Sequence, residues 1–276
     1  MTLIEVLTLA ADHLAKHSSD SSRLDAEVLL ADALKLSRID LYLKFDRHLT
    51  ESELTTYRGL VARRAKGEPV AYLVGHKEFM ALEFEVTPAV LVPNPDTEVL
   101  VQRAVAIARE AARPLRVADV GTGSGCIAIA IAHYAPNMEV WAGDISANAL
   151  EVAARNVSRH GVEGRVHLAC GDLMTPLPGT FDLVCANLPY VPAGKQLAPE
   201  VVAQPARALF ADQEGAGLVT RLLAEAPARL KPGGRVLVEL DLSILAAVLD
   251  AAGRGFAGHT VHRDLGGHER VLETWS

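Results

Sequence analysis

Cysteine is scarce in this chain of 276 residues, which has only Cys126, Cys170 and Cys185. The three residues stand singly in apolar stretches, without a Cys-x-x-Cys pair or the His/Cys spacing that binds zinc. The pattern excludes a zinc ribbon and gives no disulfide framework. An odd number of thiols that look buried indicates a reducing compartment.

Long apolar runs are also missing, because no stretch reaches the length that spans a bilayer. The first 17 residues carry Glu5 and Asp12, and they lack the basic start and apolar run of a signal peptide. Lys and Arg number 27 against 34 Asp and Glu, a net charge of −7. This balance argues against a surface that tracks phosphate backbones throughout. We expect a soluble cytoplasmic monomer without a membrane partner.

Residues 1–70 are expected to form a small helical domain. Apolar residues recur at helical spacing over residues 3–14, and "SSDSS" at 18–22 ends that pattern and can cap a second helix. Thr50 and Glu53 make a capping box that opens a further helix.

Residues 71–92 change character and are expected to form a β-hairpin linker. Apolar and polar residues alternate there, with Phe79 and Phe84 among the apolar ones. The second domain is therefore expected at residues 93–276, beginning at the prolines of "LVPNPDTEVLV".

From residue 115 onward, strands alternate with helices, a pattern typical of a parallel sheet covered on both faces. The last two expected strands, 259–265 and 269–275, are joined by Gly266 and Gly267 and predict an antiparallel hairpin. The fold class is therefore α/β, a Rossmann-like seven-stranded sheet with a terminal antiparallel hairpin. The five expected parallel strands are 115–120, 139–144, 165–172, 181–189 and 235–241.

The stretch "VADVGTGSGCIAIAIA" carries the strongest local signal. Its glycines, at 121, 123 and 125, allow a tight turn and let a ligand lie against the backbone. Ligands of such sheets bind at the carboxyl ends of the strands. The loop is not a P-loop, since no Gly-Lys-Ser/Thr follows, and its spacing differs from the dinucleotide fingerprint.

Three successive strand ends carry a carboxylate, namely Asp119, Asp144 and Asp172. A carboxylate beside the first glycine disfavours a pyrophosphate and favours a ligand with a positive group. Asp144 is placed to accept both hydroxyls of a ribose, and Asp172 to reach an adenine edge. A single Asp could be a helix cap, but three in register favour S-adenosylmethionine. The predicted cofactor-binding residues are Asp119, Gly121, Thr122, Gly123, Ser124, Gly125, Asp144, Ile145, Asp172, Leu173 and Asn187.

The stretch "FDLVCANLPYVP" ends an apolar strand at Asn187, on the same edge of the sheet. Asn and Pro form turns, so the stretch alone could be an ordinary loop start. However, "NLPY" resembles the Asn-Pro-Pro-Tyr box of amino-group methyltransferases. Together with "LVPNPDTEVLV", "GDISANALEVAARN" and "DLGGHERVLETW", it makes the chain resemble the HemK/PrmC family nearly end to end.

This resemblance implies a protein-(glutamine-N5) methyltransferase that acts on peptide chain release factors, at the glutamine of their Gly-Gly-Gln motif. The cofactor would be S-adenosylmethionine, the product S-adenosylhomocysteine, and no metal is implied. The implied catalytic and substrate-binding residues are Asn187, Leu188, Pro189 and Tyr190. The Asn187 oxygen and the carbonyl of Leu188 would orient the amide nitrogen, and Tyr190 would offer a ring face to a planar group.

The chain departs from the family pattern at Asn94, Leu188, Gln204 and Ala211-Asp212, so the substrate stays open at this point. One alternative is an N6-adenine or other nucleic-acid amino-methyltransferase, because the box suits a base amine equally well. The other is a catalytically inactive scaffold that binds S-adenosylmethionine. The basic residues Arg58, Arg63, Arg64 and Lys66 are expected to be a solvated helix face, and nucleic-acid binding is not expected.

Overall fold

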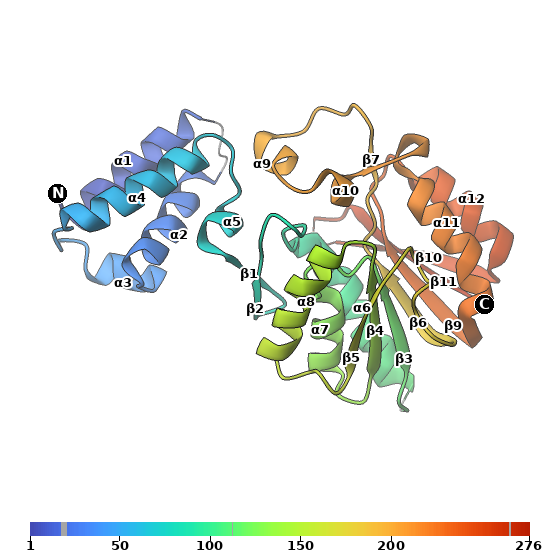
Figure 1. Cartoon of the computed structure of the whole chain (residues 1–276). Helices are drawn as coiled ribbons and strands as arrows, with labels where there is room; N and C mark the ends of the chain where they lie inside the picture. The colour runs from blue at the N-terminus through green and yellow to red at the C-terminus, as the bar shows by residue number, and fades with distance from the viewer. Residues whose placement is uncertain (18–20, 112, 265) are drawn as a thin grey trace. The chain divides into compact units, whose positions relative to one another are not determined.

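The computed structural model describes residues 1–17, 21–111, 113–264 and 266–276 (Figure 1). The chain divides into two compact units. The first comprises Met1–His76 and Leu197–Ala203, and the second comprises Lys77–Gln196 and Gln204–Ser276. Each unit buries an apolar core of its own.

The first unit is helical, and its N-terminal helices are blue in Figure 1. Thr2, Ser37 and Thr50 each close a capping box with the residue three positions on, so the box predicted at Thr50 is confirmed. Of the predicted break at 18–22, residues 18–20 lie outside the described residues. The helices are α1 Leu3–Ala15, α2 Ser22–Leu34, α3 Arg38–Leu43, α4 Glu51–Arg64, α5 Val70–Val74 and α9 Pro199–Val202.

Arg64 corrects the prediction of a solvated basic face on α4. Its side chain is only 7% exposed, and its guanidinium lies 2.7 Å from Asp25 and also pairs with Glu200. Burial opposes the charge of Arg64, but these two carboxylates outweigh it and raise its pKa. The neighbouring Arg63 pairs with Glu68. Two of the four basic charges are thus matched inside the unit, which weakens this face as a phosphate-binding patch.

The segment after α4 is partly helix and partly hairpin. Helix α5 occupies its start, where the sequence predicted β structure or an extended linker. The predicted hairpin is confirmed for strands β1 His76–Phe79 and β2 Leu82–Glu85. Phe79 and Phe84 are 1% and 0% exposed, and their rings meet edge to face. The buried aromatic pair explains why the alternating pattern predicts this hairpin.

The second unit contains a seven-stranded sheet with the order β10-β11-β9-β6-β3-β4-β5. Neighbours from β5 to β9 pair in parallel, whereas β11 is antiparallel to both β9 and β10. The predicted fold class and terminal hairpin are therefore confirmed. The strands are β3 Arg116–Val120, β4 Glu139–Asp144, β5 Val166–Cys170, β6 Phe181–Ala186, β9 Leu230–Glu239, β10 Gly258–Arg263 and β11 Glu269–Trp275.

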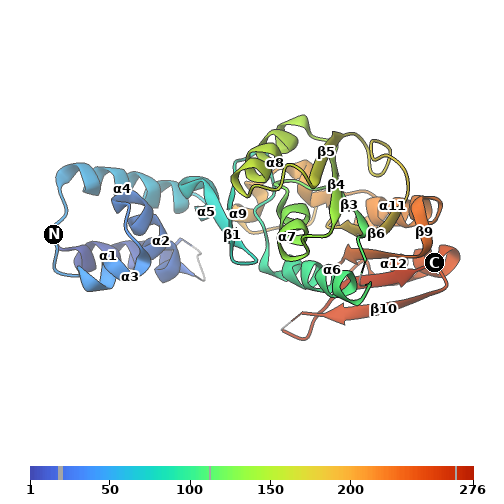
Figure 2. The same cartoon turned by 90° about the horizontal axis from the view of Figure 1, so that it is seen from below.

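Helices cover both faces of this sheet (Figures 1 and 2). Helices α6, α7 and α8 pack on one face, and α11 and α12 pack on the other. Residues of β6 alternate between the two cores, with Leu183 and Cys185 in the first and Val184 and Ala186 in the second. The helices are α6 Glu98–Ala111, α7 Cys126–Tyr134, α8 Ala147–Arg159, α10 Ala206–Leu209, α11 Gly217–Glu225 and α12 Leu245–Gly255.

Several short elements escaped prediction. Strands β7 Val191–Pro192 and β8 Phe210–Ala211 form a separate two-stranded sheet. Three 3-10 turns are also present, namely η1 Pro95–Thr97, η2 Gln213–Gly215 and η3 Ala226–Arg229. Cys185 is buried, but Cys170 is exposed at the end of β5, which corrects the expectation that all three thiols are buried. In the part of the chain described, no helix is long and apolar enough to cross a membrane.

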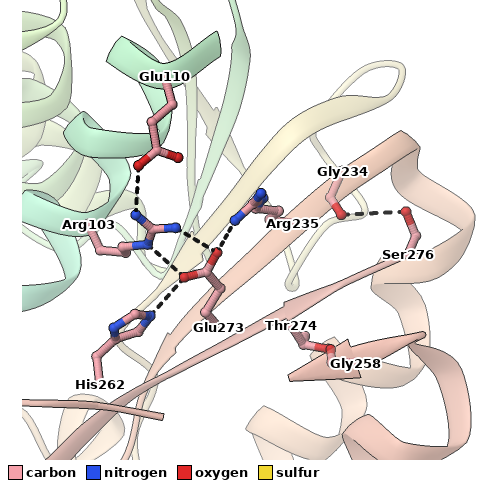
Figure 3. A network of polar contacts seen from close by, with 9 residues as sticks. All are labelled: Arg103, Glu110, Gly234, Arg235, Gly258, His262, Glu273, Thr274 and Ser276. Atoms are coloured by element: carbon pink, nitrogen blue, oxygen red, sulfur yellow. Dashed lines mark hydrogen bonds and ion pairs between the residues drawn. The ribbon is translucent and has the colours of Figure 1, made fainter. Parts of the chain in front are cut away.

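A buried carboxylate fastens the terminal hairpin to the rest of the unit (Figure 3). Glu273 on β11 has a side chain only 2% exposed and accepts from Arg103 of α6 at 2.7 Å. Arg235 of β9 also pairs with it, and Nε2 of His262 lies 2.7 Å away. Burial opposes ionisation, but these three partners outweigh it and lower the pKa of Glu273 to about 2.

Candidate active site

A cavity of about 730 Å³ opens at the carboxyl ends of the parallel strands. All of its lining residues belong to the second unit. Most of the predicted site residues lie in its wall, namely Gly121, Thr122, Gly123, Ser124, Asp144, Ile145, Asp172, Leu173, Asn187, Leu188 and Pro189. The cavity therefore joins the glycine loop to the Asn box.

Asp119 and Gly125 do not line this cavity. Asp119 is fully buried, and one of its oxygens accepts from the Thr122 hydroxyl at 2.6 Å and from the Ala128 N–H at 3.2 Å. Burial raises its pKa to about 7. Asp119 thus stabilises the glycine loop from its buried side, because its side chain binds Thr122 of the loop and the start of α7. Gly125 is the N-cap residue of α7 at φ +83°, where a Cβ would lie 3.0 Å from Ile129.

Tyr190 is not among the residues that line the cavity, and the ring face that it would offer the substrate stays a prediction. Its partly buried side chain packs against the core beneath α11 and α12. Strand β7, which pairs with β8, begins directly after Tyr190. At Gly215 a Cβ would come 2.1 Å from the Tyr190 carbonyl, so the backbone is closely packed here.

The glycine loop packs directly against the Asn box. Gly121 has φ +76°, which disfavours any other residue, and a Cβ there would lie 2.9 Å from Leu188 Cδ2. Leu188 is only 4% exposed. Its side chain thus fills space beside the loop, and the residue also lines the cavity.

Asp144 ties the loop to the start of α8. One carboxylate oxygen accepts from the Gly123 N–H at 2.9 Å, and the other accepts from the Ser146 N–H at 2.8 Å. A carboxylate oxygen can accept more than one hydrogen bond, so both oxygens of Asp144 retain capacity for a ligand hydroxyl.

Asp172 pairs with Arg221 across the cavity wall, at 2.6 Å. Both side chains are about half exposed and line the cavity. Arg221 was not identified from the sequence, because it lies on α11, 49 residues further along the chain. It balances the Asp172 charge at the position where an adenine edge was expected.

Asn187 follows β6, and its Nδ2 donates to the hydroxyl of Thr97 at 3.0 Å. Thr97 is 2% exposed, belongs to η1 and also lines the cavity. It was missed as a site residue, although it stands within the family-like stretch "LVPNPDTEVLV". Residues 88–94 just before it contribute further wall, which sequence reasoning did not assign.

Two family models match successive parts of the chain. The family model described as the PrmC N-terminal domain matches residues 5–75, and the methyltransferase small domain matches residues 95–215. The release factor glutamine methyltransferase of Geobacter sulfurreducens is 41% identical over 276 residues, covering 98% of this chain and 95% of that protein. The chain belongs to the release factor glutamine methyltransferase family. It is therefore an S-adenosylmethionine-dependent methyltransferase.

Other members of the release factor glutamine methyltransferase family are similarly close. The one from Rhodopirellula baltica is 40% identical and covers 98% of this chain and 95% of its own length. Among solved structures, a methyltransferase from Pyrococcus furiosus has a TM-score of 0.52 at 22% identity, covering 78% of this chain and 96% of that one. The hMettl16 catalytic domain has a TM-score of 0.58 at 16% identity, covering 79% and 81%. These two likenesses support the fold alone.

Proposed function

We propose that this protein methylates the side-chain amide nitrogen, N5, of the glutamine in the Gly-Gly-Gln motif of peptide chain release factors. The observation that carries the proposal is the position of Asn187, at the cavity and beside Gly121 of the glycine loop. Relatives that match nearly the whole chain carry the name release factor glutamine methyltransferase.

The cavity fits S-adenosylmethionine by its size and its polar groups. Asp144 has acceptor capacity left for ribose hydroxyls, and the backbone of residues 121–124 allows close approach of a ligand. Asp172 would face the adenine edge. When bound, the cofactor supplies a methyl group on a positively charged sulfur, which keeps the electron pair of the broken carbon–sulfur bond.

Asn187 and Leu188 would hold the substrate amide. Its nitrogen is a poor nucleophile, because the lone pair is delocalised into the carbonyl. Two acceptors, the Asn187 side-chain oxygen and the Leu188 carbonyl, would bind its two hydrogens and favour the positive charge that develops. Pro189 restricts residue 188 to extended backbone and thereby fixes that carbonyl. The methylated nitrogen then releases one proton to solvent water and returns to a neutral N-methyl amide.

The proposed reaction is tested by transfer of labelled methyl to a purified release factor. We expect label on the intact factor and none on a variant in which Asn replaces the motif glutamine. DNA and ribosomal RNA are assayed in parallel. Label on nucleic acid alone would favour the amino-methyltransferase alternative, and normal cofactor binding without any transfer would favour a scaffold.

Asp144→Ala should weaken S-adenosylmethionine binding by about 1–3 kcal/mol, the usual cost of losing charge-assisted hydrogen bonds. Isothermal titration calorimetry measures this change. Asp250→Ala is a matched control, since Asp250 lies exposed on α12 and pairs only with Arg254 among the described residues. Unchanged affinity in Asp144→Ala would restrict Asp144 to anchoring the loop.

The helical domain at residues 1–70 is proposed to recognise the protein substrate. Ile39 and Leu43 are 72% and 74% exposed on the same short helix, α3, and exposed apolar side chains that lie close together mark a candidate interaction surface. The double variant Ile39→Glu, Leu43→Glu should raise KM for an intact release factor about tenfold, the loss of roughly 1.4 kcal/mol of binding. Methylation of a short peptide that carries the motif should not change.

Leu242→Glu serves as the matched control for this test, because Leu242 is 56% exposed in the second unit. The recognition proposal fails if the double variant and the control have the same KM for the intact factor.

A further inference from the structure

Thr97 lies on a 3-10 turn that is held by hydrogen bonds between neighbouring residues and by a proline. Its backbone N–H donates to the Asn94 carbonyl at 3.0 Å, and the Asn94 side chain accepts from the Asp96 N–H at 3.2 Å. Pro95 fixes the first position of this 3-10 turn. The Thr97 hydroxyl, which receives the hydrogen bond from Asn187 Nδ2, is therefore held in place by its backbone.

Glu239 lies behind this pair at the end of β9. Strands β6 and β9 pair in parallel with Ala186 opposite Val238, which brings Asn187 and Glu239 next to one another at the sheet edge. Glu239 is 0% exposed, and neither of its oxygens has a hydrogen-bond partner of good geometry among the described residues. Burial raises its pKa to about 7, while the nearness of Thr97 and Asn187 works against that rise.

A side-chain amide has one accepting end and one donating end. Thr97 and Glu239 place acceptor oxygens on the inner side of Asn187, so the donating nitrogen belongs there. We propose that Thr97 and Glu239 are positioning residues that hold the Asn187 amide with its nitrogen inward and its oxygen toward the cavity. This inference rests on the function proposed above, in which that oxygen accepts from the substrate.

The order of the three groups allows a chain of donors in one direction. Asn187 Nδ2 donates to the Thr97 hydroxyl, and that hydroxyl has its own hydrogen to give to the Glu239 carboxylate. Such chains polarise each member, so an ionised Glu239 makes the Asn187 oxygen a stronger acceptor. The charged and titratable groups facing Glu239 are Arg270, which favours its ionised form, Asp96, which opposes it, and Tyr190 and Cys126.

Thr97→Val and Thr97→Ser separate the hydroxyl from the shape of the side chain. Thr97→Val keeps the shape and removes the acceptor, and we expect kcat to fall about tenfold with KM for S-adenosylmethionine unchanged. Thr97→Ser keeps the hydroxyl and should restore most of the rate. In an Asn187→Ala background, Thr97→Val should have no further effect, because the group it positions is gone. An additive loss there would overturn the proposal.

The pH profile tests Glu239. In the unchanged protein, kcat should fall as pH drops through about 7, where Glu239 takes up a proton and ceases to be only an acceptor. Glu239→Gln should remove this dependence. A fall in kcat that persists in Glu239→Gln would exclude Glu239 as its origin.

A measurement without substrate distinguishes this inference from the proposed function. In ¹⁵N-labelled protein, the Asn187 side-chain NH₂ signals are identified by their loss in Asn187→Ala. Their exchange with water should quicken at least tenfold in Thr97→Val and stay slow in Thr97→Ser. Unchanged exchange in Thr97→Val overturns the positioning role. Slow exchange in a protein that transfers no methyl group to release factors overturns the proposed function while supporting the orientation.

Discussion

Asn187→Ala should bind S-adenosylmethionine nearly normally and turn over about 10²–10³ times more slowly, the typical cost of removing one preorganised polar contact. The cofactor wall is otherwise intact, since the glycine loop and Asp144 are held by their own backbone hydrogen bonds. Single-turnover methyl transfer at saturating cofactor measures the loss. A melting curve shows whether the folded fraction has changed. Full turnover per folded molecule would remove the catalytic assignment of Asn187.

Asn187→Asp refines this test. It keeps an acceptor toward the cavity but replaces the inward nitrogen with oxygen, beside the Thr97 hydroxyl and the buried Glu239 carboxylate. The new carboxyl group and Glu239 would lie so close together that repulsion opposes ionisation of both. We therefore expect lower turnover together with a lower melting temperature, whereas cofactor affinity stays close to normal.

Acid should destabilise the protein through Glu273. The pKa of a glutamate carboxyl is ordinarily 4.5, and that of Glu273 in the folded protein is about 2. The folded state therefore favours the ionised form. This contribution is fully present above about pH 5 and is lost as pH falls toward 2. Its size is on the order of 3 kcal/mol, from about 1.4 kcal/mol for each pKa unit.

Urea unfolding of the unchanged protein and Glu273→Gln at pH 7, 4 and 3 measures this contribution. The difference between the two free energies of unfolding should be largest at pH 7 and shrink as pH falls. Asp250→Asn is the control, since its pair with Arg254 is exposed and worth little. A difference that stays constant with pH would mean that Glu273 acts through packing rather than through its charge.

Local patterns predicted most of the fold. Capping boxes such as that at Thr50 are recognisable because both partners lie within four residues. The parallel strands were predicted because both of their faces are buried, as with Leu183 and Val184, and leave a continuous apolar run. Strands β7 and β8 are two residues each, too short to leave any pattern.

The site was predicted less completely, because its parts meet across long stretches of chain. Thr97 and Asn187 are 90 residues apart, and their contact depends on how η1 lies against the end of β6. Asp119 was recognised as a strand-end carboxylate, but strand alternation turns its side chain toward α7 instead of the cavity. Tyr190 directly precedes the short pairing of β7 with β8, which the sequence did not reveal.

The helical unit is discontinuous, because Leu197–Ala203 belongs to it as well as Met1–His76. Within that unit a Cβ at Gly67 would lie 2.6 Å from Pro199, and Arg64 pairs with Glu200. Exchange of the first 76 residues alone with those of a relative would therefore join one parent's helices to the other parent's α9. Chimeras of two family members should fold more often when Met1–His76 and Leu197–Ala203 come from the same parent. Such an exchange needs a first crossover after His76 and two further ones, on either side of Leu197–Ala203. These two lie more than 100 residues beyond the first.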